Sequence, residues 1–108
     1  MPRPEKQRCV QVQPGVVYFK PRGIPLRVLD QVQLSIDELE AIRLADLEGL
    51  DQKKGAEKME ISRPTFGRIV ARARQKVADA LVNGKAVSIE GGNIVLKEVP
   101  RSESDCIK

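Results

Sequence analysis

Three helix-start signals in the middle of this chain constrain its fold more than any other feature of the sequence. The N-cap candidates are Ser35, Asp51 and Ser62. Ser35 is followed three residues later by Glu38, which is the spacing of a capping box. With glycines as stop signals after the first and third segments, the pattern predicts three helices. They cover residues 36–48, 52–59 and 63–82.

The third predicted helix has one apolar side. At 100° per residue its apolar side chains form a single stripe. The members of the stripe are Phe66, Ile69, Val70, Ala73, Val77, Ala80 and Leu81. The second helix adds Ala56, a small residue where two helices can cross closely, and Met59. We therefore expect a helix-turn-helix domain over residues 34–84.

The flanking segments have β-type patterns. Residues 1–33 begin with a basic arm and continue with short apolar and polar runs, which predict short strands. Two further β-type runs surround Gly91-Gly92 and predict a β-hairpin over residues 85–99, before a polar tail at 100–108. A chain of 108 residues is expected to form one domain. The predicted fold class is mainly α with minor β: a three-helix helix-turn-helix core with N-terminal extended segments and a C-terminal hairpin.

The composition excludes several kinds of catalytic and metal site. The chain has no His, which removes imidazole bases, Ser-His and Cys-His pairs, and His-ligated metals. Cys9 and Cys106 lie far apart, whereas a structural zinc site needs about four ligands in closely spaced pairs. The N-terminal run MPRPEKQR has no apolar stretch, so no secretory signal is expected. We expect a cytoplasmic protein that is not an enzyme, has no cofactor or metal, and does not bind membranes.

Basic charge is concentrated at the N-terminus and in the segment that contains the third predicted helix. Residues 61–85 contain six Lys or Arg and one Asp, a block that is typical of a site for a polyanion. In a helix-turn-helix the first residues of the recognition helix reach base edges, and here the recognition helix is the third predicted helix. We therefore expect Arg63, Thr65 and Arg68 to contact bases. Phosphate contacts are expected from the rest of this helix and from the N-terminal arm. These residues are Ser62, Gly67, Arg72, Arg74, Lys76, Arg3, Lys6 and Arg8.

Five blocks of sequence resemble a known family. They are MPRPEKQR at 1–8, FKPRGIPL at 19–26, DELEAIRLADLEGL at 37–50, MEISRPTFGRI at 59–69 and ALVNGKAVSIEGG at 80–92. They resemble an uncharacterised prokaryotic family of small predicted DNA-binding proteins, the domain of unknown function 134 type. Its helix-turn-helix is similar to region four of bacterial sigma factors. The resemblance implies a transcriptional regulator that binds double-stranded DNA. This chain departs from the family pattern at Gly55, where the family has Ala, and at Glu60, where it has Gly.

Other functions stay open at this point. A unit similar to sigma region four could instead dock on RNA polymerase or another regulator without its own DNA specificity. The acidic side of helix 36–48, which we interpret as a solvated face, is its candidate surface. That side carries Asp37, Glu40, Asp46 and Glu48. A redox role for the two cysteines and RNA binding are further alternatives. We also expect a homodimer formed through the hairpin, because two subunits can read two half-sites.

Overall fold

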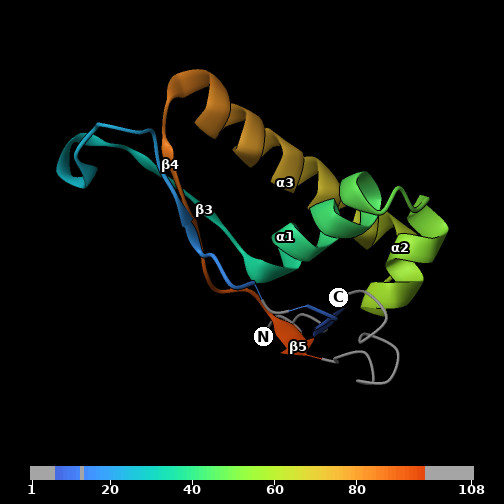
Figure 1. Ribbon diagram of the computed structural model, residues 1–108. Helices are drawn as coiled ribbons and strands as arrows, with labels where there is room; N and C mark the ends of the chain where they lie inside the picture. Colours follow the sequence, from blue (N-terminus) through green and yellow to red (C-terminus); the bar gives the residue numbers. More distant parts are fainter. Residues whose placement is uncertain (1–6, 13, 97–108) are drawn as a thin grey trace, which may run out of the picture.

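The computed structural model describes residues 7–12 and 14–96, which form three main helices and two small sheets (Figure 1). The elements in chain order are β1 (Arg8–Val10), β2 (Tyr18–Phe19), the 3-10 turn η1 (Leu26–Val28), β3 (Gln31–Leu34), α1 (Ile36–Ile42), the π-helical turn η2 (Arg43–Leu47), α2 (Gln52–Met59), α3 (Arg63–Asn83), β4 (Ala86–Ile89) and β5 (Ile94–Leu96). About 49% of the structure is helical and about 18% is strand. The fold is therefore mixed α/β, which corrects the expectation of a mainly α chain.

The predicted helix starts are confirmed. The Ser35 hydroxyl accepts a hydrogen bond from the Glu38 N–H at 3.3 Å, and the Glu38 carboxylate accepts one from the Ser35 N–H at 3.0 Å. The Asp51 carboxylate accepts the N–H of Lys54 at 2.8 Å, and Ser62 caps α3 in a similar way. The first predicted helix, 36–48, is present as α1 and its continuation η2.

The last two strands do not form a hairpin. β4 lies between β2, to which it is antiparallel, and β3, to which it is parallel. β5 instead pairs in parallel with β1, so that Arg8 lies opposite Ile94. Gly91 and Gly92 have positive φ values of 82° and 108° and lead the chain from one sheet to the other. The hairpin prediction is therefore wrong for the described residues, and residues 97–99 lie outside them.

Two apolar clusters hold the elements together. The first joins α1, η2, α2 and α3, and the second joins α3 to the three-stranded sheet through Leu34, Ala73 and Ile89. The first consists of Ala41, Leu44, Ala56, Met59, Phe66, Ile69 and Val70. The predicted apolar stripe of α3 is wrong only at Leu81, which is 78% exposed because the groove beside it is open.

Three residues, Glu60 to Ser62, join α2 to α3. Glu60 has φ 58° and ψ 45°, a left-handed conformation that costs a residue with a side chain about 1–2 kcal/mol. Ile61 is half-buried and packs against the cluster that contains Phe66.

Among the described residues, no helix is both long and apolar enough to cross a membrane.

Candidate nucleic-acid interface

The first two turns of α3 present polar side chains to solvent. The Ser62 hydroxyl accepts the N–H of Thr65 at 3.3 Å and donates to Thr65 Oγ1 at 2.8 Å. Arg68 Nη2 donates to the same Thr65 oxygen at 3.2 Å. Arg63 and Arg68 are exposed, and neither forms an ion pair with another described residue. Of the three residues expected to contact bases, Thr65 and Arg68 are therefore joined by a hydrogen bond and Arg63 is exposed at the start of the same helix, while Ser62 is used as the helix cap.

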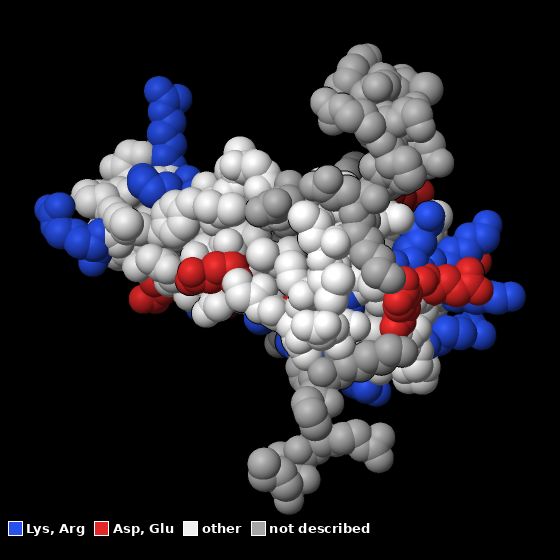
Figure 2. Space-filling model, turned by 90° about the horizontal axis from the view of Figure 1, so that it is seen from below, with Lys and Arg blue, Asp and Glu red and all other residues white. Residues whose placement is uncertain are grey.

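A second basic group lies on the neighbouring helix α2. Lys53, Lys54 and Lys58 are exposed and form no ion pairs within the part of the chain that the structure describes. Figure 2 shows Lys and Arg side chains gathered at this end of the molecule and again at the opposite end. Sequence analysis missed these lysines, although the spacing of Lys54 and Lys58 places both on one helix face.

The basic residues farther along α3 are engaged by carboxylates of the same chain. Arg74 holds Asp46 with two hydrogen bonds, at 2.6 Å from Nη2 and 3.1 Å from Nε. The hydrogen bond from Arg74 lowers the pKa of the exposed Asp46 carboxyl below its ordinary value. Arg72 Nη1 lies 3.8 Å from Glu38 Oε2, although 57% of the Arg72 side chain is exposed. This half of α3 is therefore largely neutralised by the protein itself.

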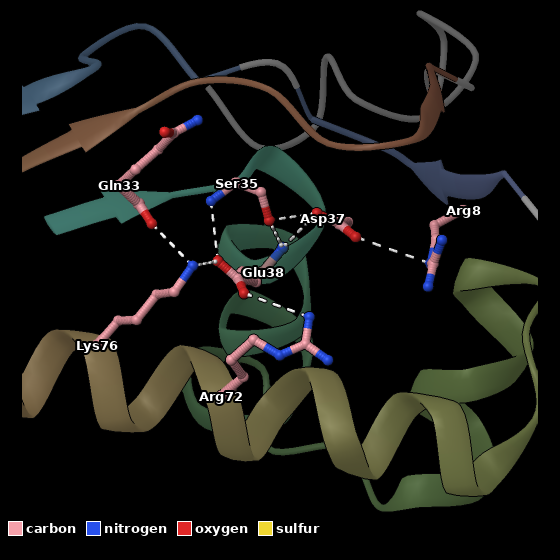
Figure 3. A network of polar contacts seen from close by, with 7 residues as sticks. All are labelled: Arg8, Gln33, Ser35, Asp37, Glu38, Arg72 and Lys76. Carbon is pink, nitrogen blue, oxygen red and sulfur yellow. Dashed lines mark hydrogen bonds and ion pairs between the residues drawn. The ribbon is translucent and has the colours of Figure 1, made fainter. Parts of the chain in front are cut away.

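Glu38 is the centre of a buried polar network (Figure 3). Its Oε1 accepts hydrogen bonds from Lys76 Nζ at 2.8 Å and from the Ser35 N–H at 3.0 Å. Lys76 Nζ also donates to the Gln33 carbonyl at 2.8 Å. Burial by itself raises the pKa of Glu38, but the hydrogen bonds from Lys76 and Ser35 outweigh it and bring the pKa below its ordinary value. Lys76 thus ties α3 to β3 and α1 and points into the fold.

Two further carboxylates of α1, Asp37 and Glu40, are also buried, so the interpretation of this side as a solvated face is wrong for both of them. Glu40 accepts two hydrogen bonds from Arg43, at 2.8 and 2.9 Å, and one from the backbone N–H of Gln11. Asp37 pairs with Arg8 at 3.7 Å. β1 and α3 cover this side of α1, and for this reason its carboxylates are buried.

Arg8 belongs to β1 and is buried, so it is not part of an exposed N-terminal arm as the sequence predicted. Gly67 faces Gln52 of α2: a Cβ there would lie 3.3 Å from Gln52 Nε2. Arg3 and Lys6 lie outside the described residues. The basic residues farther along α3 pair with carboxylates, whereas those of α2 and of the start of α3 form no ion pairs within the described chain.

Comparison with known proteins places the chain in a family. The model of the family described as "Protein of unknown function DUF134" matches residues 1–97. The chain belongs to this family. It is 63% identical over 93 residues to UPF0251 protein TTE1845 of Caldanaerobacter subterraneus subsp. tengcongensis, covering 86% of this chain and 79% of the relative. It is 51% identical to UPF0251 protein DET0218 of Dehalococcoides mccartyi, covering 97% and 96% of the two chains. No solved structure matches.

The described part of this DUF134 chain contains no cluster of three or more His, Cys, Asp or Glu side chains that could hold a metal. Cys9, one of the two cysteines considered for redox chemistry, is 5% exposed within β1. Cys106 lies outside the described residues.

Proposed function

We propose that this chain is a sequence-specific double-stranded DNA-binding protein that regulates transcription, with the first turns of α3 placed in the major groove. One observation carries the proposal: Arg63 and Arg68 stand exposed beside Thr65 and have no carboxylate partner among the described residues. Arginine presents a planar fork of donors that matches the O6 and N7 acceptors of guanine.

The neighbouring helix supports this orientation. α2 joins α3 through three residues, and its exposed lysines 53, 54 and 58 lie close to the start of α3 in sequence and at the same end of the molecule. In helix-turn-helix proteins the first helix contacts the phosphate backbone while the second enters the groove. Lysines on α2 suit the first role, because each neutralised phosphate releases bound counterions.

The set of proposed contacts changes in the light of the geometry. Base contacts stay with Arg63, Thr65 and Arg68. Lys76 and Arg8 are left out, because both are directed at buried carboxylates. Arg72 and Arg74 reach a phosphate only if they leave Glu38 and Asp46, so we assign them a minor share of the binding.

The alternative function is docking on RNA polymerase or another regulator, but part of the acidic surface expected to mediate it is not exposed. That surface was the acidic side of the first helix, of which Asp37 and Glu40 are buried. Asp46, which remains at the surface, is paired with Arg74. The positive charge at the start of α3 favours binding of a polyanion there over docking through the acidic side of the first helix.

The test is selection of binding sites from random duplex DNA, followed by titration of labelled duplexes at a stated salt concentration. Arg63→Ala or Arg68→Ala should cost about 1–3 kcal/mol on the selected site and much less on random duplex. Lys54→Ala should weaken both duplexes alike and reduce the salt slope by about one unit. The matched control is Arg22→Ala, an exposed arginine in the segment between β2 and β3, and the titrated duplexes carry a single selected site so that pairing of two subunits does not add to the affinity.

Two results would contradict the proposal. The wild type could show no duplex binding at low salt, in which case a specific protein partner is the remaining hypothesis. Alternatively, Arg22→Ala could weaken binding as much as Arg63→Ala, which would mean that net charge and not the start of α3 determines binding.

A further inference from the structure

Exposed apolar side chains are concentrated at the end of the molecule opposite α2, and two of them, Phe19 and Leu81, line a groove there. Of the eleven large apolar side chains that are exposed in the described residues, six lie in β2, in the segment that connects β2 to β3, or in the last turn of α3. They are Phe19, Ile24, Leu26, Val28, Leu81 and Val82, with exposed fractions from 39% to 80%. An apolar patch of a few hundred Å² on a protein surface is often a functional contact surface.

The groove lies between α3 and the three-stranded sheet and has a volume of about 510 Å³. Its walls are apolar and include Phe19, Leu39, Val77, Leu81 and Val87. Lys20 and Lys85 also line it: the Lys20 amine donates to two backbone carbonyls, and the Lys85 amine pairs with Asp79 at 3.0 Å. Apart from these two lysines, every residue that lines the groove is apolar.

The segment at residues 20–30, which we call the arm, starts at the edge of this groove and projects away from the helices (Figure 1). The Lys20 amine holds the first turn of the arm by hydrogen bonds to Pro21 and Ile24, at 3.1 and 2.7 Å. Within η1 of the arm no residue is buried, and Val28 is 63% exposed. The arm is thus an ordered apolar projection that does not fill the groove of its own chain.

We propose that a second copy of this chain occupies the groove, with the arm of each subunit packed into the groove of the other. An arm and a groove that adjoin on one molecule can pair reciprocally about a two-fold axis, which is the commonest symmetry of soluble oligomers. The arm supplies arginines 22 and 27 to the polar rim of such an interface, where arginine is enriched.

The available area fits this occupant. A large aliphatic side chain carries roughly 60–120 Å² of apolar surface, so the six exposed side chains offer roughly 200–450 Å² at their observed exposure. The half-buried walls of the groove add to this. One side of a standard homodimer interface has about 800 Å², of which about 65%, or about 500 Å², is apolar. The six side chains together with the groove walls therefore approach the apolar area of one side of a homodimer interface.

The experiment is sedimentation equilibrium of the full chain from low to tens of micromolar, without DNA, so its outcome is independent of the proposed function. We expect the wild type to dimerise and Leu81→Glu to weaken the dimer by about 30-fold or more, because a buried carboxylate replaces an apolar anchor. Leu26→Glu on the arm should do the same. The matched control is Leu47→Glu, because Leu47 has the same 78% exposure but lies in η2, away from the groove.

A folding control accompanies these runs. The unfolding temperature of a dimer rises with protein concentration, so the wild type and Leu47→Glu should show this rise and Leu81→Glu should not. A monomeric wild type would overturn the proposal, and decanoate added to the same samples would then show whether a small apolar anion takes the groove. A dimer that survives both Leu81→Glu and Leu26→Glu, or that Leu47→Glu dissociates equally, would also overturn it.

Discussion

Two glycines inside helices, Gly55 of α2 and Gly67 of α3, have opposite surroundings. A Cβ on Gly55 would lie 2.3 Å from Cζ of Phe66, a ring that is 1% exposed at the centre of the larger cluster. A Cβ on Gly67 would meet only the side chain of Gln52, at 3.3 Å. Gly55 is therefore needed for α2 to approach the Phe66 ring, whereas Gly67 is not required by packing within the described protein.

This difference predicts opposite effects of the same substitution. Gly55→Ala should destabilise the protein by about 1–3 kcal/mol, because overpacking against a buried ring outweighs the gain in helix propensity. Gly67→Ala should stabilise it by up to about 1 kcal/mol, because the exposed Gln52 side chain can move and alanine favours the helix. Urea unfolding of the two variants beside the wild type measures both effects. Stabilisation by both substitutions would show that the Phe66 ring can shift, contrary to the packing described above.

At the scale of elements, α1 is held in place by its carboxylates as well as by its apolar residues. Glu38 contacts α3 through Lys76 and Arg72, while Glu40 contacts the segment after β1 through the Gln11 backbone. The buried carboxylates of α1 thus contact both the N-terminal part of the chain and the long helix α3. Its position should depend on the ionisation of these groups.

This dependence gives a prediction for pH. The pKa of Glu38 in the folded protein lies below its ordinary value of 4.5, so its contribution to stability is complete above that value and is lost as pH falls through the folded pKa. The unfolding free energy of the wild type should fall steeply below about pH 4.5. Glu38→Gln should lower stability near neutral pH by about 1–3 kcal/mol, because Lys76 and Ser35 lose a charged acceptor, and should flatten the acid dependence.

Urea unfolding at a series of pH values from 7 to below 4 measures both parts of this prediction. Asp46→Asn is the control, because the pKa of Asp46 is also lowered but its pair with Arg74 is exposed and worth about 0–1 kcal/mol. If Glu38→Gln keeps the acid dependence of the wild type, other carboxylates are responsible for it.

The same elements show how far the sequence predicts this fold. Ser35 and Glu38 are three residues apart, so the capping box and the helix start could be predicted from local spacing alone. The partners of Lys76 lie 38 and 43 residues away, and β5 pairs with a strand at the other end of the chain. No local pattern contains such pairings, which is why the buried carboxylates were interpreted as solvated and β5 as half of a hairpin. The position of Arg63, Thr65 and Arg68 in the first turns of α3 was also predictable, because helix starts are local features, whereas their contacts with DNA stay a prediction.

At the scale of the whole molecule, the two proposed surfaces lie at opposite ends. The basic surface of α2 and the start of α3 is at one end, and the arm is at the other (Figures 1 and 2). The longest dimension of the chain is 44 Å. Two copies joined through their arms would therefore direct their α2 ends away from each other. Their separation would exceed the 34–36 Å that corresponds to about one turn of DNA.

This arrangement predicts the spacing of DNA half-sites. Duplexes that carry two selected half-sites about 20 bp apart should bind the wild type more tightly than duplexes with about 10 or 15 bp between centres, because about 20 bp is two helical turns and places both sites on one face of the duplex. The preference over a single half-site should be about 100-fold, since the second contact becomes intramolecular. Leu81→Glu should lose this preference and still bind a single half-site as the wild type does. Anisotropy titrations at one salt concentration measure these ratios, and a Leu81→Glu protein that keeps the preference would show that the subunits meet through another surface.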